Sequence, residues 1–246
     1  GLPSNLFYGT GIPACIIILD KKDAINRKDI FMIDASKYFI KDGNKNKLRE
    51  EDIKKITDIY LGRIEEEKYS RIVTMKEIEK EDYNLNIPRY IDSSDKETIQ
   101  DIKAHLLGGI PEVDIEKLSK YWSVAPNLKK ELFKKNKKEG YFDLVIKKEK
   151  INEKISGSKE FIAYFENLIE KVNRWQEENK DKLYNVNSKT RVKDLIEELS
   201  NNILKIFEND KLIDKYEAYE FLMEYYNNTL KDDLHLIIEN GWIPKL

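Results

Sequence analysis

The hydrophobic positions near the start of the chain form two short, continuous runs. Residues 14–19 read Ala-Cys-Ile-Ile-Ile-Leu, and residues 30–33 form a second apolar run between two aspartates. A run of this length without polar alternation is typical of a strand that is buried on both faces. Both runs therefore predict strands of an α/β sheet, although two strands do not make a doubly wound sheet.

Helical spacing of apolar residues dominates the rest of the chain. Short helices are predicted at residues 49–63, 75–81, 94–107, 113–122 and from Pro126 onward. Thr74 is the expected N-cap of the second of these helices. The segment 82–92 is predicted to be extended, because the residue before Pro88 is biased away from helix. A short strand is expected at residues 141–146.

Three longer apolar stripes follow at the spacing of an α-helix. Their residues are Phe161, Tyr164, Phe165, Leu168, Ile169, Val172 and Trp175; Val192, Leu195, Ile196, Leu199, Ile203 and Ile206; and Tyr216, Tyr219, Leu222, Met223 and Tyr226. Such stripes form either an internal core or a surface that receives a partner helix. The predicted fold class is mainly α with a small β component.

The charge of the chain is balanced overall but uneven along its length. Lys and Arg number 44 against 46 Asp and Glu, which excludes binding of polyanions through bulk positive charge. Residues 129–154 nevertheless carry ten lysines against five acidic residues, with Phe133, Tyr141 and Phe142 interleaved. This segment is either a surface that contacts phosphates or a solvated helical face.

Composition also restricts the setting and the chemistry of the protein. No apolar run reaches the roughly 18–20 residues of a membrane span, so no membrane association is expected. The single cysteine, Cys15, cannot form an internal disulfide, which indicates a reducing, cytoplasmic location. One cysteine and two histidines make a metal site unexpected, and neither His105 nor His235 belongs to a recognisable catalytic arrangement.

A glycine-containing motif near the start needs its context before it can be interpreted. Residues 7–11, Phe-Tyr-Gly-Thr-Gly, match the F-x-G-x-G pattern of loops that bind S-adenosylmethionine. Such a loop follows a strand and opens a helix, so that helix amides face the ligand. Here the glycines precede the predicted strand 14–19, so the context does not favour a cofactor loop.

The opening of the chain does resemble a specific family. The segments 2–19, 31–36 (Phe-Met-Ile-Asp-Ala-Ser), 44–53 and 82–91 (Asp-Tyr-Asn-Leu-Asn-Ile-Pro-Arg-Tyr-Ile) are similar, in this order, to the modification (M) subunit of type I restriction–modification systems. These subunits are N6-adenine DNA methyltransferases. The resemblance implies that residues 1–92 are the carboxy-terminal part of an α/β catalytic domain. It implies that residues 93–246 form a helical domain for subunit assembly and DNA contact.

The same resemblance implies a role for the loop before residue 14. In this family an aromatic residue of that loop stacks on the target adenine. By its position in the loop, Phe7 is the corresponding residue of this chain. An enzyme that modifies a base takes it out of the stack and offers it an aromatic face. The alternative is that Phe7 is a core residue at the entrance of a strand. Further candidates for contact with DNA or with the base-stacking loop are Tyr8, Gly9, Thr10, Asn44, Lys45 and Asn46.

The chain lacks the family's catalytic tetrapeptide, which is Asp or Asn, then two prolines and an aromatic residue. No two prolines are adjacent in the sequence. We therefore expect a carboxy-terminal fragment with no catalytic or cofactor-binding residues of its own, inactive alone. The intact enzyme is expected to use S-adenosylmethionine and to work with DNA, a specificity subunit, a second M subunit and a restriction subunit. The alternative is a non-enzymatic helical scaffold that binds a specificity subunit or DNA.

Overall fold

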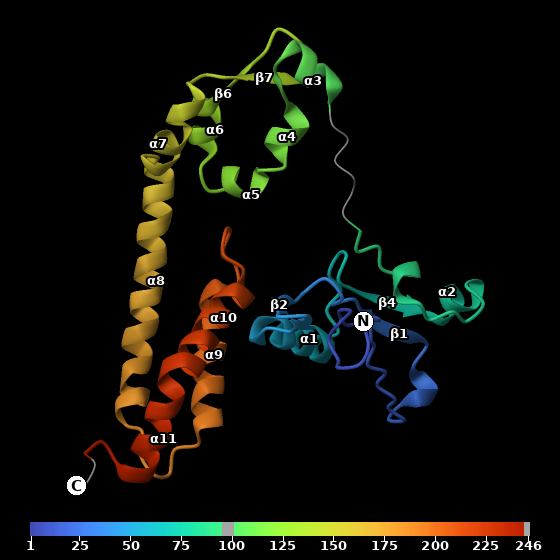
Figure 1. The fold of residues 1–246 in the computed structure, drawn as a ribbon, viewed down its shortest axis with the longest axis vertical. Coiled ribbons are helices and arrows are strands. Elements are labelled where there is room, and N and C mark those ends of the chain that lie inside the picture. The colour runs from blue at the N-terminus through green and yellow to red at the C-terminus, as the bar shows by residue number, and fades with distance from the viewer. Residues whose placement is uncertain (95–100, 244–246) are drawn as a thin grey trace. The chain divides into compact units, whose positions relative to one another are not determined.

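The computed structural model describes residues 1–94 and 101–243. The chain divides into two compact units, Gly1–Glu97 and Thr98–Leu246, which are described separately below. Helices predominate and the sheets are small, so the protein is mainly α with a small β component, as predicted (Figure 1).

The first unit is built around an antiparallel pair of strands, β1 and β4, with Asp29 opposite Thr74 and Ile33 opposite Ser70. A second antiparallel pair, β2 and β3, forms a hairpin. The elements of this unit are η1 (Ala24–Asn26), β1 (Asp29–Ile33), β2 (Ile40–Asp42), β3 (Lys45–Lys47), α1 (Glu50–Gly62), β4 (Ser70–Thr74), α2 (Met75–Lys80) and η2 (Ile87–Arg89).

The core of the first unit lies on both sides of the β1–β4 pair. One buried cluster contains Met32, Val73, Ile78, Tyr90 and Ile91. A second contains Ala35, Ile59 and Tyr69. The helices α1 and α2 thus bury their apolar positions against opposite sides of the strand pair, as the spacing of those positions predicts.

The strand predicted over residues 14–19 is not formed, and this prediction is wrong. The segment is extended, but among the described residues only Ala14 makes a bridge, to Leu2. Ile16, Ile17 and Ile18 are 57–73% exposed. A strand buried on both faces needs neighbouring strands and covering helices, and the described part of the chain places none beside this segment.

The strand β4 pairs with β1 but was absent from the predictions. Its sequence, Ser-Arg-Ile-Val-Thr, carries three consecutive β-branched residues at 72–74. This is the local signal that could have identified the strand. Thr74 then serves as the N-cap of α2, as predicted, and its side chain accepts a hydrogen bond from the Glu77 amide.

The second unit starts with a three-stranded sheet in the order β5-β7-β6, surrounded by short helices. Its elements are α3 (Ile102–Leu107), β5 (Ile110–Pro111), α4 (Glu112–Glu116), α5 (Ser119–Trp122), α6 (Pro126–Leu132), β6 (Phe133–Lys135), β7 (Tyr141–Leu144), η3 (Lys148–Lys150) and α7 (Ile151–Ser156). The predicted strand at 141–146 is thus confirmed by β7.

Two predicted helices differ from the observed ones in this region. The helix predicted over 94–107 is described only from α3 onward, with Asp101 as its N-cap, and its earlier part lies largely outside the described residues. The helix predicted over 113–122 is divided into α4 and α5. The Trp122 indole donates to the Ile115 carbonyl at 2.7 Å, which ties α5 back to α4.

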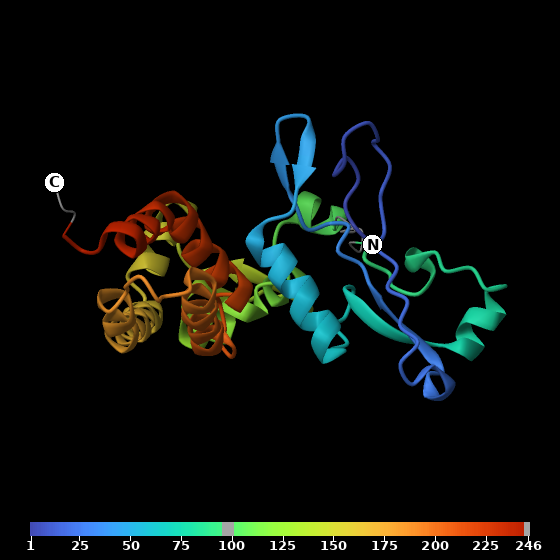
Figure 2. The ribbon, with the colours of Figure 1, turned by 90° about the horizontal axis from the view of Figure 1, so that it is seen from below.

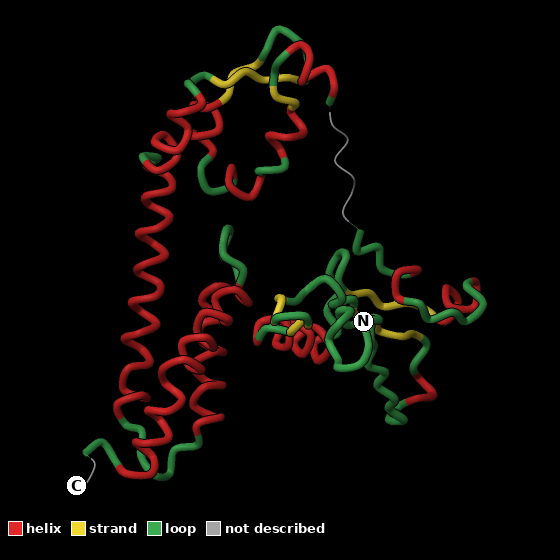
Figure 3. The backbone as a smooth tube through the Cα atoms, viewed as in Figure 1, coloured by secondary structure: helices red, strands yellow, loops and turns green. Residues whose placement is uncertain are grey.

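The rest of the second unit consists of long helices that pack side by side (Figure 3). They are α8 (Lys159–Tyr184), α9 (Val192–Phe207), α10 (Lys215–Tyr225), the π-helix η4 (Tyr226–Leu230) and α11 (Lys231–Asn240). The buried core includes Leu195, Leu199, Ile203, Leu222 and Leu234. The three predicted stripes therefore lie on helices, and most of their residues face this core.

One of the stripes is divided between the core and the surface. On α8, Leu168, Val172 and Trp175 pack against the core. Phe165 and Ile169, from the same stripe, are 53% and 59% exposed. The helix α8 thus carries apolar side chains that the described residues leave uncovered.

A buried carboxylate joins α8 to the loop between α9 and α10. The Asp210 side chain is 2% exposed and accepts hydrogen bonds from the Tyr164 hydroxyl at 2.5 Å and from the Lys171 ammonium at 3.0 Å. The amides of Leu212 and Ile213 also donate to it, each at 3.1 Å. Burial alone would raise the pKa of Asp210, but these hydrogen bonds outweigh it and lower the pKa to about 2.

Candidate functional site

The loop that contains Phe7 projects from the first unit, and its base is closed by a hydrogen bond from the Leu2 amide to the Ala14 carbonyl, 2.8 Å long. Asn5 and Gly9 have positive φ angles of 53° and 80°, which turn the backbone. The Phe7 side chain is 51% exposed. The structure therefore does not make it a core residue.

The hairpin β2–β3 lies beside this loop (Figure 2). The Asn46 amide N–H donates to the Asn5 carbonyl at 3.0 Å, and Asn46 Nδ2 donates to the Ser4 carbonyl at 2.6 Å. Lys45 Nζ donates to the Phe7 carbonyl at 2.8 Å. Three hydrogen bonds thus join segments that are about 40 residues apart in the sequence.

The remaining predicted residues of the site differ in the contacts that they make between the loop and the hairpin. Tyr8 is 93% exposed, and Lys45 Nζ lies 5.7 Å from its ring centre. The Thr10 hydroxyl accepts from the Ile12 amide at 3.3 Å, which is a contact within the loop. Asn44 is exposed in the turn of the hairpin and makes no contact to the loop among the interactions described. The structure therefore brings together Phe7, Tyr8, Lys45 and Asn46.

The acceptors Ser4 and Asn5 were not among the predicted site residues. Both use backbone carbonyl groups, which every residue carries, so no side-chain pattern could have identified them. Asn46 is buried, and its Oδ1 has no hydrogen-bond partner among the described residues. The sequence placed Asn46 in a polar loop, where burial was not expected.

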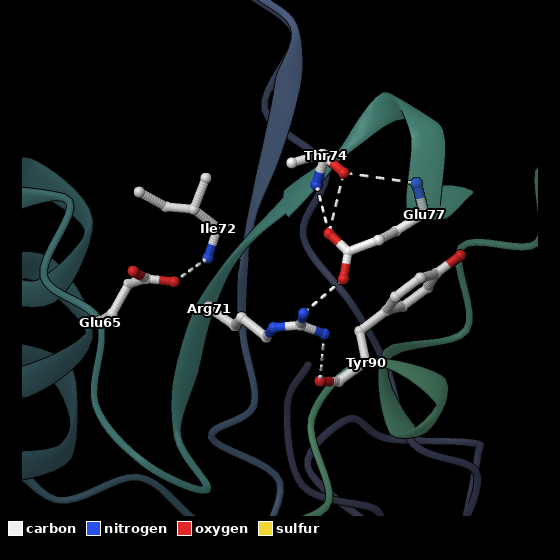
Figure 4. Close-up of polar contacts among 6 residues, drawn as sticks. All are labelled: Glu65, Arg71, Ile72, Thr74, Glu77 and Tyr90. Atoms are coloured by element: carbon white, nitrogen blue, oxygen red, sulfur yellow. Dashed lines mark hydrogen bonds and ion pairs between the residues drawn. The ribbon is translucent and has the colours of Figure 1, made fainter. Parts of the chain in front are cut away.

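The segment 82–91, which carries part of the family resemblance, has a structural role. Its Tyr90 is buried, and the Tyr90 carbonyl accepts from Arg71 at 3.3 Å (Figure 4). Arg71 also pairs with Glu77. The backbone amide and the hydroxyl of Thr74 both donate hydrogen bonds to the Glu77 carboxylate. These bonds, and the backbone one most strongly, hold the pKa of Glu77 below its usual range. This network ties β4, α2 and the segment 82–91 together.

The loop and the hairpin offer groups that are suited to recognition. The loop and hairpin present an exposed aromatic ring beside an ammonium group and a buried amide. Among the residues that the structure describes, no group of three or more His, Cys, Asp or Glu side chains could hold a metal ion. The site as observed can therefore bind a flat, apolar surface, and it contains no recognisable acid–base pair.

The lysine-rich segment 129–154 lies on the small sheet and the neighbouring short helices of the second unit. Lys129 pairs with Glu116 and Lys154 with Glu131. Lys138 Nζ lies 3.4 Å from the Tyr141 ring centre. A phosphate-contacting role for the other lysines stays a prediction. None of the helices in the described ranges combines the length and the apolar character that membrane crossing requires.

Comparisons with known proteins find a family match at the start of the chain. Residues 1–98 match the family model described as N-6 DNA Methylase. The type I restriction enzyme MpnII methylase subunit of Mycoplasma pneumoniae is 34% identical over 102 residues, which are 42% of this chain and 19% of that protein. The MjaVII methylase subunit of Methanocaldococcus jannaschii is 42% identical over 94 residues, 37% of this chain and 16% of that protein.

A solved structure also matches part of the chain. It is the type I restriction-modification system methyltransferase subunit from Streptococcus thermophilus, with 44% identity over 38% of this chain and 20% of that one, and a TM-score of 0.35. The matched segment spans less than a fifth of the length of the curated relatives. Residues 1–98 are similar to the N-6 DNA methylase family, and the chain is similar over part of its length to the methylase subunits of type I restriction enzymes.

Proposed function

We propose that this chain is part of a DNA methyltransferase subunit that transfers a methyl group from S-adenosylmethionine to adenine N6. The observation that carries the proposal is the half-exposed Phe7 ring. Its loop is held by hydrogen bonds from the hairpin and lies within the residues that match the methylase family model. A ring in this position can replace the stacking that an extruded adenine loses. In this proposal the protein is cytoplasmic, and a specificity subunit selects the DNA site.

S-adenosylmethionine does not fit the described residues. Gly9 and Gly11 lie in a loop that continues through residues 12–19 without a helix, so the glycines do not open a helix as they do in a cofactor loop. The chain also has no adjacent prolines and so lacks the family's catalytic tetrapeptide. We therefore assign target-base stacking to this chain and derive no step of methyl transfer from its residues.

The proposal predicts that the complete enzyme methylates adenine and that this chain alone does not. The complete methyltransferase, assembled with its specificity subunit, is expected to form N6-methyladenine in DNA, measured by mass spectrometry of the digested DNA. The 246-residue chain alone is expected to form none, because the tetrapeptide is absent. Methylation of adenine by the chain alone, or methylation only of cytosine by the complete enzyme, contradicts the proposal. Sequencing of the methylated DNA identifies the target adenine.

A second role, in subunit assembly, is favoured by the uncovered side chains of α8. Phe165 and Ile169 lie one turn apart on the same face of a 26-residue helix and are both more than half exposed. An amphipathic helix with this spacing can pack against a helix of a partner. We infer that this face of α8 contacts the specificity subunit in the complete enzyme.

The assembly role predicts that charge on this face breaks the complex. The double substitution Phe165→Glu and Ile169→Glu is expected to abolish co-purification with the specificity subunit, because it places two carboxylates in an apolar contact. The helical content, measured by circular dichroism, is expected to persist because both side chains are exposed. Glu170→Gln, an exposed polar neighbour, is the matched control. Retained co-purification of the double variant contradicts the assembly role of α8.

A further inference from the structure

The Lys45 side chain makes a hydrogen bond to the backbone of Phe7. Its ammonium donates to the Phe7 carbonyl at 2.8 Å and lies 5.7 Å from the centre of the Tyr8 ring. The contact joins the exposed tip of the loop to strand β3, 38 residues further along the chain. One side chain therefore contacts both aromatic residues at the tip.

The neighbouring Asn46 holds the base of the same loop. Its backbone amide and its Nδ2 atom donate to the carbonyls of Asn5 and Ser4. Asn46 is 4% exposed, so this anchor is shielded from water. The hairpin thus contacts the loop at two levels, with Asn46 at the base and Lys45 at the tip.

The loop needs such support because little else fixes it. Tyr8, Gly9 and Gly11 are exposed, and Gly9 adopts a positive φ of 80°. A glycine-containing, exposed loop loses much conformational entropy when it is ordered. A hydrogen bond from a charged donor is about twice as strong as a neutral one, so a lysine is well suited to hold the carbonyl next to the Phe7 side chain.

We propose that Lys45 is a positioning residue that holds the Phe7 ring in the orientation needed to stack on the target base. The inference rests on the proposed function of Phe7 and extends it to a second segment of the chain. The structure places the Lys45 ammonium against the loop itself. Lys47, exposed on the same strand, offers a matched lysine for comparison.

The test is a double-mutant cycle in the complete enzyme. We measure kcat/KM on a duplex that contains the target adenine, and we measure base fluorescence on a second duplex that carries 2-aminopurine in its place. The fluorescence of 2-aminopurine rises when the base leaves the stack and falls when it stacks on an aromatic ring. Lys45→Met is expected to lower kcat/KM about tenfold, which is the loss expected for a hydrogen bond from a charged group. It is also expected to change the fluorescence in the same direction as Phe7→Ala. Lys45→Arg keeps a donor and is expected to restore most of both signals.

The cycle separates positioning from phosphate contact. If Lys45 acts through Phe7, Lys45→Met has little further effect in the Phe7→Ala background. A lysine that contacts a phosphate instead gives additive losses and lowers the slope of log K against log salt concentration by about one. Lys47→Met is expected to leave the fluorescence unchanged. Melting temperatures of all variants identify any loss of folding.

The outcomes distinguish this inference from the proposed function. If Phe7→Ala changes both kcat/KM and fluorescence while Lys45→Met changes neither, or the two losses add, the positioning role is wrong and the stacking role stands. If Phe7→Ala itself leaves both unchanged, the stacking role is wrong and the inference fails with it. Non-additive losses with rescue by Lys45→Arg support the positioning role.

Discussion

Phe7→Ala in the complete methyltransferase is expected to lower kcat/KM for DNA by roughly fivefold to 150-fold. Stacking of a base on an aromatic side chain is worth about 1–3 kcal/mol, and alanine removes it. The melting temperature is expected to change little, because the Phe7 ring is half exposed and lies in none of the buried clusters. Steady-state methylation kinetics measure kcat/KM, and thermal unfolding of the same preparations measures the melting temperature.

Two further variants make the Phe7 experiment specific. Phe7→Trp keeps an aromatic face and is expected to retain most of the activity. Tyr60 is an aromatic residue of α1 in the same unit and is 40% exposed. Tyr60→Ala is therefore a matched control and is expected to change kcat/KM only slightly. A Phe7→Ala variant that keeps full activity, or that loses activity only in proportion to a large loss of stability, shows that Phe7 is not the stacking residue.

Asp210→Ala is expected to destabilise the second unit by about 3–5 kcal/mol. The substitution leaves the Tyr164 hydroxyl, the Lys171 ammonium and two backbone amides without their acceptor. Each donor that loses its acceptor in a shielded position costs about 1–3 kcal/mol, and this substitution affects four donors at once. All three tryptophans lie after residue 98, so tryptophan fluorescence during urea unfolding reports on this unit.

The pH dependence of stability tests the same carboxylate. The folded-state pKa of Asp210, about 2, lies below the value of about 4 for an unfolded aspartate. Its contribution is therefore present above pH 4 and is lost as the pH falls towards 2. A difference of this size corresponds to about 2 kcal/mol. In Asp210→Ala this part of the acid dependence is expected to disappear.

A control and a graded variant complete the Asp210 experiment. Asp194 forms an exposed ion pair with Arg191, and Asp194→Ala is expected to change the free energy of unfolding by less than about 1 kcal/mol. Asp210→Asn keeps an acceptor oxygen and is expected to fall between the wild type and alanine. Equal stabilities of Asp210→Ala and Asp194→Ala contradict the structural role assigned to Asp210.

The helices were predictable from the sequence because their periodicity is local. The spacing of Leu195, Leu199 and Ile203 places one stripe of α9 in the core, and Thr74 starts α2 as expected. The strand prediction for residues 14–19 was wrong because burial of a strand is not a local property. The apolar run predicts burial on both faces, but burial of a strand depends on neighbours that the run itself cannot supply.

The residues of the candidate site were named from the sequence, but the contacts between them could not be predicted. Phe7, Lys45 and Asn46 were each singled out in the sequence, the first by family resemblance. Nothing in the sequence indicated that β3 donates to the backbone of the loop, because the acceptors are carbonyl groups of Ser4, Asn5 and Phe7. Backbone acceptors leave no mark on residue types, so the structure was needed to join the two segments.

Photo-cross-linking tests the central claim, that Phe7 meets the target base, most directly. The complete enzyme is bound to a DNA duplex with 5-iodouracil at the position of the methylated adenine and is then irradiated. Mass spectrometry of the digested complex locates the attached nucleotide. The account predicts attachment at Phe7. Attachment at Tyr8 or at a residue outside the loop, or no attachment while the DNA is bound, contradicts it.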